Sequence, residues 1–422
     1  MKAFLLVFGC LLFLPSRAQE TDSLNFYYQM GIEAYKRGDH TAFLKAMQLA
    51  EGLRSNHPAI TYNLASAYSL TGQPEPAIKY LRKYVLMNSL TDISKEEDFM
   101  AIKELKEFRE IIKLSENLKD SIKESKVAFT LKTSDFHAES MTYHLTGKTF
   151  YFGGVHHRGI IKIKGKKEEI WLDDRDEEDL YAVMGMEIGL SGKTLWVCTA
   201  ALPEMKGYHE DLDGKSSVIE FDLKTKAIVT KVVVNQGNLF GDLTMNKLGE
   251  VFISDGRQNY IYKIQSGDTA VQRFSDLSKV TRNLQGIACS PDQTSLYVSD
   301  YVNGILKLNL ESRQSSWLEF PDDIPFKGID GLYCHGNTLI AIQNGTRPKR
   351  VLQLTLSPPG ERVQAYNVLE QATERLSEPT QGVIIGTRFY YIANSPWDNY
   401  PESHQWKDDH EKPLVILNGS IQ

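Results

Sequence analysis

The sequence predicts an α + β multidomain protein, in which N-terminal α-helical hairpins precede an all-β six-bladed propeller. Two observations carry this prediction. From residue 21 to residue 123, apolar residues recur every three or four positions, which is the period of amphipathic helices. From residue 127 to residue 422 the pattern alternates, and short strands bounded by Gly, Asn and Asp repeat with a spacing typical of propeller blades.

Length, charge and the first residues limit the class of protein. At 422 residues the chain is too long for one ordinary domain, and a net charge of −6 without an aromatic-interleaved basic stripe gives no reason to expect nucleic acid as a partner. Residues 1–18 combine Lys2, an apolar run and small residues before Gln19, so we expect a signal peptide cleaved near Ala18. No second apolar run is long enough for a transmembrane span. The mature protein is therefore expected to be exported, either secreted or periplasmic.

The helical region repeats itself. The segments "EAYKRGD" and "SAYSLTG" place Gly38 and Gly72 at matching positions 34 residues apart, and residues 94–119 form a degenerate third unit. This pattern resembles the tetratricopeptide repeat. The resemblance implies a module that packs on another domain or holds a protein or peptide partner.

Six segments of the β-rich region share one pattern, in which a polar or small residue leads into an apolar step, a turn and an aromatic-aliphatic strand. Their spacings are 45, 57, 44, 45 and 51 residues, which predicts six blades. We expect residues 127–133 to complete the last blade, because pairing the two ends of the chain removes an exposed sheet edge. The leading residues of the six segments are Glu139, Met184, Gly241, Gln285, Asp330 and Gln381.

These leading residues are expected to converge, because the innermost strand of every blade lines one central channel. Glu139 and Asp330 would then face each other and would repel unless a cation lay between them. Gln285 can add an amide oxygen and Asp242 lies one residue from the ring, so the oxygen donors suit a hard divalent cation. The alternative is a wet channel in which these residues bind only water.

The propeller segments also carry a family resemblance. "AESMTYHLTGKTFYFGG" and "IDGLYCHGNTLIAIQNG" resemble segments of the SMP-30/gluconolactonase family of six-bladed, metal-binding lactonases. The resemblance implies that Glu139 is a metal ligand and that Asp330 is both a ligand and the base. Because the donors are oxygens, we expect a divalent metal ion, and calcium in particular. Gly241 stands where the family has an Asn ligand, so this ligand is missing or has moved to Asp242 or Asn238.

Further residues are candidates for catalytic or structural roles. His156 follows the first inner strand pair and is a candidate general base at neutral pH, although tandem histidines are also common in exposed turns. Asp255, Asp300 and Asn344 directly follow inner strands and are expected to cap blade corners by bonding to the backbone. Trp397 is expected to pack between blades.

Two functions remain open at this point. One is a secreted, metal-dependent hydrolase of lactones or related esters. The other is a non-catalytic scaffold, in which the channel ion is structural and the helical repeats hold a partner. No GxSxG, HExxH or Gly-rich phosphate loop occurs, which argues against serine hydrolases, zincins and nucleotide enzymes.

Overall fold

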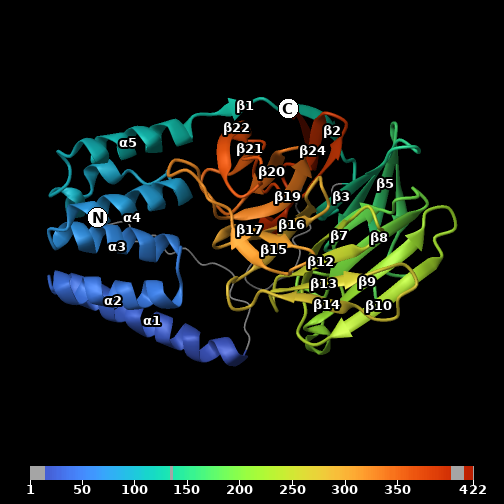
Figure 1. Cartoon of the computed structure of the whole chain (residues 1–422), viewed down its shortest axis with the longest axis horizontal. Helices are drawn as coiled ribbons and strands as arrows, with labels where there is room; N and C mark the ends of the chain where they lie inside the picture. Colours follow the sequence, from blue (N-terminus) through green and yellow to red (C-terminus); the bar gives the residue numbers. More distant parts are fainter. Residues whose placement is uncertain (1–14, 134–135, 401–412, 422) are drawn as a thin grey trace. The chain divides into compact units, whose positions relative to one another are not determined.

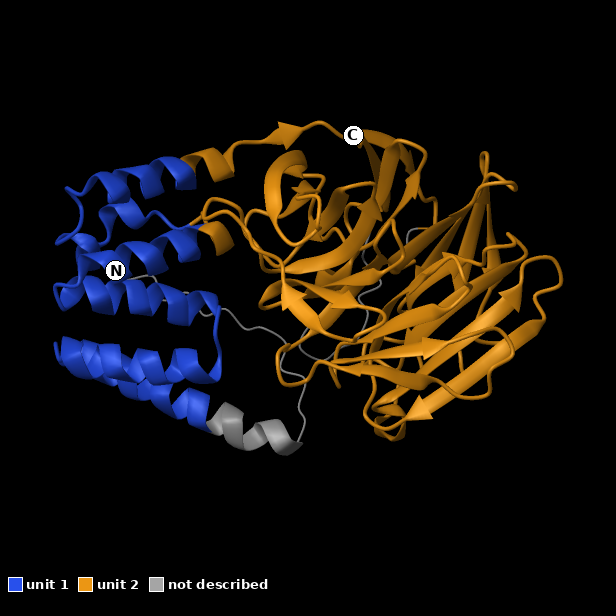
Figure 2. Ribbon diagram, viewed as in Figure 1, with its two compact units in different colours: residues 1–85, 91–115 blue, residues 86–90, 116–422 orange. Residues whose placement is uncertain are grey.

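The computed structural model describes residues 15–133, 136–400 and 413–421. The chain forms two compact units, Met1–Val85 with Thr91–Ser115, and Leu86–Leu90 with Glu116–Gln422 (Figure 2). Most of the predicted signal peptide, residues 1–14, lies outside the described residues. Among the helices that the structure describes, none is both long and apolar enough to cross a membrane.

Paired helices form the first unit, as predicted (Figure 1). Gly38 and Gly72 adopt positive φ angles of 75° and 71° and end the first helix of each pair, a conformation that glycine reaches without strain. Asp39 then caps the next helix by accepting a hydrogen bond from the Ala42 amide, 3.0 Å away. The helices are α1 (Pro15–Lys36), α2 (His40–Leu53), α3 (Pro58–Leu70), α4 (Pro74–Met87) and α5 (Lys106–Lys119), with the 3₁₀ turns η1 (Ile93–Lys95) and η2 (Glu97–Phe99).

The second unit is a six-bladed propeller. Within the described residues the strands form six antiparallel sheets. In chain order the first three are β3 (Ala138–His144), β4 (Thr149–Gly154), β5 (Ile160–Lys164) and β6 (Lys167–Leu172); β7 (Ala182–Ile188), β8 (Thr194–Ala200), β9 (Lys215–Asp222) and β10 (Ile228–Asn235); and β11 (Phe240–Met245), β12 (Val251–Asp255), β13 (Tyr260–Ile264) and β14 (Gln272–Asp276).

Two of the remaining three blades include a strand from the start of the unit. They are β15 (Leu284–Cys289), β16 (Ser295–Asp300), β17 (Gly304–Asn309) and β18 (Ser315–Trp317); β19 (Ile329–His335), β20 (Thr338–Gln343), β21 (Arg350–Leu356), β22 (Val363–Gln371) and β1 (Ile122–Lys123); and β23 (Gly382–Ile385), β24 (Arg388–Ile392), β25 (Val415–Ser420) and β2 (Lys126–Thr130). The pairing of β2 with β25 confirms that the N-terminal strand completes the sixth blade.

The blades close into a ring. Each inner strand contacts the inner strand of the next blade, and β23 contacts β3. A separate apolar cluster fills each of the six blade interfaces, and every cluster draws buried side chains from two neighbouring blades. The core of the propeller therefore lies between the sheets, which leaves the axis to the residues of the inner strands.

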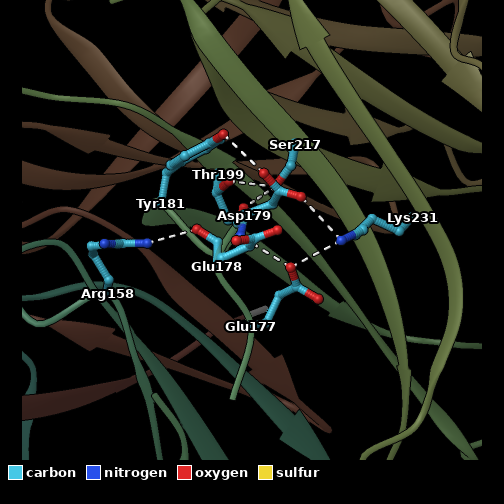
Figure 3. Close-up of polar contacts among 8 residues, drawn as sticks. All are labelled: Arg158, Glu177, Glu178, Asp179, Tyr181, Thr199, Ser217 and Lys231. Atoms are coloured by element: carbon cyan, nitrogen blue, oxygen red, sulfur yellow. Dashed lines mark hydrogen bonds and ion pairs between the residues drawn. The ribbon is translucent and has the colours of Figure 1, made fainter. Parts of the chain in front are cut away.

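Polar contacts hold the connection between the first two blades, as Figure 3 shows. Lys231 Nζ on β10 lies 3.0 Å from Glu177 Oε1 and 3.0 Å from Asp179 Oδ2. Ser217 Oγ donates to the Asp179 carbonyl oxygen at 2.8 Å, and Arg158 donates to the Leu180 carbonyl oxygen at 2.8 Å. The connection crosses from the outermost strand of one blade to the innermost strand of the next, so these contacts fix where β7 begins.

Candidate functional site

The residues that lead the inner strands lie at β-bulges. In five of the six inner strands the ladder register shifts at the same place: at Glu139, Met184, Gly241, Gln285–Gly286 and Asp330–Gly331. A bulge leaves one extra residue outside the ladder and re-aims its side chain, and bulges are common beside functional sites. Gln381 directly precedes β23 and takes the corresponding position in the sixth blade. The predicted ring therefore has a common backbone cause.

Asp330 is held in place by two side chains from neighbouring loops. Asn344 follows β20, and its Nδ2 donates to Asp330 Oδ2 at 2.6 Å and to the Pro379 carbonyl oxygen at 3.0 Å. Tyr301 follows β16, and its hydroxyl donates to Asn344 Oδ1 at 2.9 Å. The hydroxyl fixes the orientation of the amide, and the amide in turn orients the carboxyl group. Asn344 was predicted to cap a blade corner, but it reaches the channel acid.

The expected corner caps are confirmed at the two matching aspartates. Asp255 accepts hydrogen bonds from the backbone amides of Leu239, Arg257 and Gln258. Asp300 does the same for Asn283 and Asn303, among others. These carboxylates are occupied by backbone donors, so the blade corners at Asp255 and Asp300 are structural.

Glu139 is buried beside an indole. Its side chain is only 5% exposed, and Trp397 Nε1 donates to Glu139 Oε2 at 2.7 Å. Trp397 begins the 3₁₀ turn η4 (Trp397–Asn399) in the connection between β24 and β25. Thr380 Oγ1 donates to the Glu139 carbonyl oxygen at 2.9 Å, which fixes the strand beneath the side chain. Trp397 was expected to pack between blades, and its indole N–H also donates a hydrogen bond to Glu139.

Burial and neighbouring charges raise the pKa values of the acids at the channel mouth, the name used here for the end of the axis where the inner strands begin. Burial, and then the charge of Glu378, raises the pKa of Asp330 to about 7, while the hydrogen bond from Asn344 lowers it. Burial, and then Asp330, raises the pKa of Glu139 well above its usual value. Burial also raises the pKa of Glu378, although Lys349 forms an ion pair with it. Burial and neighbouring charges therefore favour the neutral form of all three carboxyl groups.

Asp242 accepts two backbone hydrogen bonds, and Gln285 donates one through its amide nitrogen. Asp242 Oδ1 accepts from the Leu243 amide at 2.8 Å and Oδ2 accepts from the Ile287 amide at 3.1 Å. Gln285 Nε2 donates to Asn283 Oδ1. Gln381 bridges the inner strands instead, since its Nε2 donates to the Met184 carbonyl oxygen at 2.7 Å. Within residues 15–133, 136–400 and 413–421, no three His, Cys, Asp or Glu side chains come close enough together to hold a metal ion.

His156 belongs to an aromatic group beside Glu139. Its Nδ1 lies 2.8 Å from the Glu204 carbonyl oxygen, and its ring centroid lies 6.1 Å from that of Tyr400. The Tyr400 hydroxyl lies 2.6 Å from Nδ1 of His137, whose ring meets Trp397 edge to face at 4.6 Å. His156 is therefore linked to the acids through aromatic contacts, and no hydrogen bond between it and either acid occurs among the described contacts.

A second space lies farther along the axis. A cavity of about 250 Å³ is lined by residues of all six inner strands, including Asp242, Glu187, Cys289 and Cys334. Burial, followed by the charge of Asp242, raises the pKa of Glu187 to about 8. The inner strands thus carry buried acids at two places: Glu139 and Asp330 at the bulges, and Glu187 at the cavity.

Sequence reasoning found the two acids and missed their partners. Asn344 and Tyr301 each directly follow the second strand of a blade. In an antiparallel hairpin the second strand ends beside the start of the first, so this placement could have indicated that both residues lie near the acids. His137 lies just before β3, Trp397 lies in the connection between β24 and β25, and Glu378 lies in the irregular connection between β22 and β23. Only the fold brings these three to the mouth.

Comparisons with known proteins support no family assignment. No family model matches the chain, and no curated protein matches it. Three of the similar solved structures illustrate the match. An aldose sugar dehydrogenase from Streptomyces coelicolor in its PQQ-bound form is 10% identical, with a TM-score of 0.49, and the match covers 71% of this chain and 98% of that one.

The other two similar structures have comparable scores. The structure of a nidogen/laminin complex is 14% identical, with a TM-score of 0.42, over 60% of this chain and 86% of that one. A putative glucose dehydrogenase from Thermus thermophilus is 9% identical, with a TM-score of 0.44, over 71% of this chain and all of that one. The assignment of six blades therefore rests on the sheet topology of the chain itself.

Proposed function

We propose that the propeller is an exported hydrolase of lactones or related esters, whose reaction takes place at the channel mouth between Asp330 and Glu139. The carrying observation is the pair of buried carboxyl groups with displaced pKa values, one of which is oriented by the Asn344 amide. Perturbed carboxyl groups that lie in a channel are typical of acid–base sites. The helical repeats would hold a protein or peptide partner.

Asp330 suits the role of general base. Its pKa of about 7 allows it to be ionised at neutral pH and still strong enough to accept a proton from water. The Asn344 hydrogen bond to Oδ2 leaves Oδ1 for the water molecule. As water attacks the carbonyl carbon, one of its protons passes to Asp330.

Glu139 suits the complementary role of general acid. Burial and the charge of Asp330 raise its pKa, which favours the protonated form, and from this form it can donate a proton to the leaving alkoxy oxygen when the acyl C–O bond breaks. Transfer of the proton from Asp330 back to Glu139 completes the cycle. Two carboxyl groups with separated pKa values commonly divide acid and base work in this way.

A hard divalent cation at the same place would need Glu139 to lose its proton, and Glu139 would then be a ligand and not the general acid. Glu139 and Asp330 offer carboxylate oxygens, and neither accepts a hydrogen bond from a Lys or Arg among the described residues. Two carboxylates resemble the partial sets that hold a hydrated Mg²⁺ more than the six to eight oxygens typical of a calcium cage. When bound, such an ion would polarise the substrate carbonyl group.

One observation favours a second candidate, a non-catalytic scaffold. Both oxygens of Asp242 are bound by backbone amides, and Gly241 offers no side-chain ligand. In this alternative the channel ion is structural, and the propeller and the helical repeats act as a binding platform.

A panel of chromogenic lactones and esters separates the two. Wild type, Asp330→Asn and the control Glu187→Gln would be assayed with chelator, with calcium and with magnesium. We expect wild type and Glu187→Gln to hydrolyse at least one substrate, and Asp330→Asn to be slower by about 10²–10⁴-fold, the usual contribution of a general base. If wild type hydrolyses no substrate in any condition, or if Asp330→Asn is as fast as wild type, the hydrolase is refuted and the scaffold is the remaining candidate.

A further inference from the structure

We propose that the propeller binds an anionic lipid surface through three hairpin turns at the end of the axis opposite the channel mouth. The turns join β3 to β4, β7 to β8 and β11 to β12, the two innermost strands of the first three blades. Each turn carries one exposed Leu and one exposed Lys. We call these six residues the Leu–Lys rim: Leu145, Lys148, Leu190, Lys193, Lys247 and Leu248. Lipid binding by the rim does not depend on the proposed function.

The leucines of the rim are unusually exposed. Their exposed fractions are 71% for Leu145, 62% for Leu190 and 78% for Leu248. The first and the last of these values exceed that of every other large apolar side chain in the described residues. Exposed apolar side chains that gather on one face of a protein mark interaction sites.

Each turn is closed by a backbone hydrogen bond. The amides of Lys148, Gly192 and Gly249 donate to the carbonyl oxygen three residues earlier, at 3.2, 2.8 and 3.0 Å. The same three residues have positive φ angles of 49°, 67° and 79°. A closed turn of this kind leaves its tip few alternative conformations, so the rim loses little conformational freedom when it docks.

The three turns lie next to one another around the ring. A Cβ atom placed on Gly192 would lie 3.5 Å from Nε2 of His144, which directly precedes Leu145. A Cβ atom placed on Gly249 would lie 3.9 Å from Cδ1 of Leu190. The rim is therefore one continuous arc. The matching turns of the other three blades contain neither Leu nor Lys, and they span residues 290–294, 336–337 and 386–387.

The lysines of the rim give it a positive charge. All three are exposed, and none of them forms an ion pair among the contacts of the described residues. Glu250, the acid at the end of the third turn, is instead paired with Lys263 at 2.9 Å. Because the whole chain carries a net charge of −6, this local excess of Lys is opposite in sign to the protein as a whole. The rim therefore complements a negatively charged surface.

The composition of the rim suits a lipid surface better than a protein partner. The centres of protein–protein interfaces are enriched in aromatic residues and depleted of Lys, and the rim has the opposite composition. Leu beside Lys is typical of surfaces that lie in the membrane interface. The apolar side chains enter the boundary between headgroups and acyl chains, while the ammonium groups stay among the phosphates.

Flotation with lipid vesicles tests the rim. The protein would be the mature chain, expected to begin at Gln19, because the apolar segment before it would bind lipid by itself. We expect wild type to float with vesicles of equal parts phosphatidylglycerol and phosphatidylcholine, less so as salt is raised, and much less with phosphatidylcholine alone. Replacing the three lysines together (Lys148→Gln, Lys193→Gln and Lys247→Gln) should weaken binding by about 100-fold, at about fivefold for each Lys near an anionic surface.

Leu190→Ser and Ile170→Ser form a matched pair. Ile170 on β6 is 64% exposed and lies outside the rim. Leu190→Ser should weaken binding to the anionic vesicles by about tenfold, because one apolar side chain is lost from the bilayer interface. Ile170→Ser should leave binding unchanged. Both side chains are exposed, so both variants are expected to fold.

Three outcomes would overturn the proposal. Wild type that floats equally with neutral and anionic vesicles would show that the lysines do not contribute. A rim that serves a protein partner instead would give no flotation with either vesicle. Equal binding by Leu190→Ser and wild type would show that another surface holds the lipid. No readout needs substrate turnover, so lipid binding stands or falls separately from the proposed hydrolase.

Discussion

Replacing Asp330 by Asn should stabilise the metal-free protein at alkaline pH, although the substitution removes the proposed base. A carboxyl group whose pKa is higher in the folded state contributes stability that is full below its unfolded pKa and is lost as pH rises through its folded pKa. For Asp330 this window runs from 3.8 to about 7. The Asn side chain keeps an oxygen for the hydrogen bond from Asn344 and has no charge to bury. The Asp330→Asn variant therefore does not lose this stability as the pH rises.

The size of the effect follows from the two pKa values. At pH 8 the difference between about 7 and 3.8 corresponds to about 4 kcal/mol, at ~1.4 kcal/mol per pKa unit. At pH 5 only the unfolded state is ionised, and the advantage of the variant falls to about 1.5 kcal/mol. The gain of Asp330→Asn over wild type should therefore grow with pH.

Urea unfolding of both proteins in chelator, at pH 5 and pH 8, measures this difference. Excess divalent cation should then reverse the order, because an ion at 100 times its Kd stabilises the binding protein by about 2.7 kcal/mol and Asp330→Asn has lost a ligand. If Asp330→Asn is no more stable than wild type at pH 8 in chelator, the claim that Asp330 is buried with a raised pKa is refuted. A gain that does not change between pH 5 and pH 8 would refute it equally.

Three other substitutions test neighbouring parts of the account. Trp397→Phe removes the donor to Glu139, so the free energy of unfolding should fall by about 1–3 kcal/mol in urea, and an unchanged value would contradict the contact. Glu187→Gln should raise the melting temperature above pH 8 and not below pH 4.5, because the folded pKa of Glu187 is about 8; a gain of equal size at both ends would argue against this burial. Lys231→Met should cost about 1–3 kcal/mol in urea unfolding, because it leaves buried Glu177 without its cation, and a neutral effect would show that the blade connection does not depend on this pair.

The repeat in the sequence was enough to predict the propeller. The six segments correspond to the two innermost strands of the six blades, and their leading residues fall on one register because each blade repeats the same hairpin. The short strand Ile122–Lys123 was not anticipated, since two residues are too few to show an alternating pattern. It joins the fifth blade through pairing with β22, a contact between residues far apart in sequence.

The site was predictable only at the level of its acids. Repetition identified Glu139 and Asp330, but the β-bulges that displace them from the ladder leave no mark in an alternating pattern. Asp242 was predicted as an ion ligand because it lies one residue from the ring. At that position its two carboxylate oxygens accept hydrogen bonds from the Leu243 and Ile287 amides. Trp397 and Asn344 reach the acids from connections whose paths depend on the packing of whole blades.

The most direct test of the account is a titration of the two acids themselves. The central claim is that the propeller brings Glu139 and Asp330 together at one desolvated mouth, where they cannot both ionise easily. Carboxyl ¹³C NMR of the metal-free protein, with Asp330→Asn and Glu139→Gln for identification, reports both groups. The account predicts a titration of Asp330 near pH 7 and a pKa of Glu139 well above its usual value, which moves down in Asp330→Asn. Two independent titrations near pH 4, the ordinary range of exposed carboxyl groups, would contradict it.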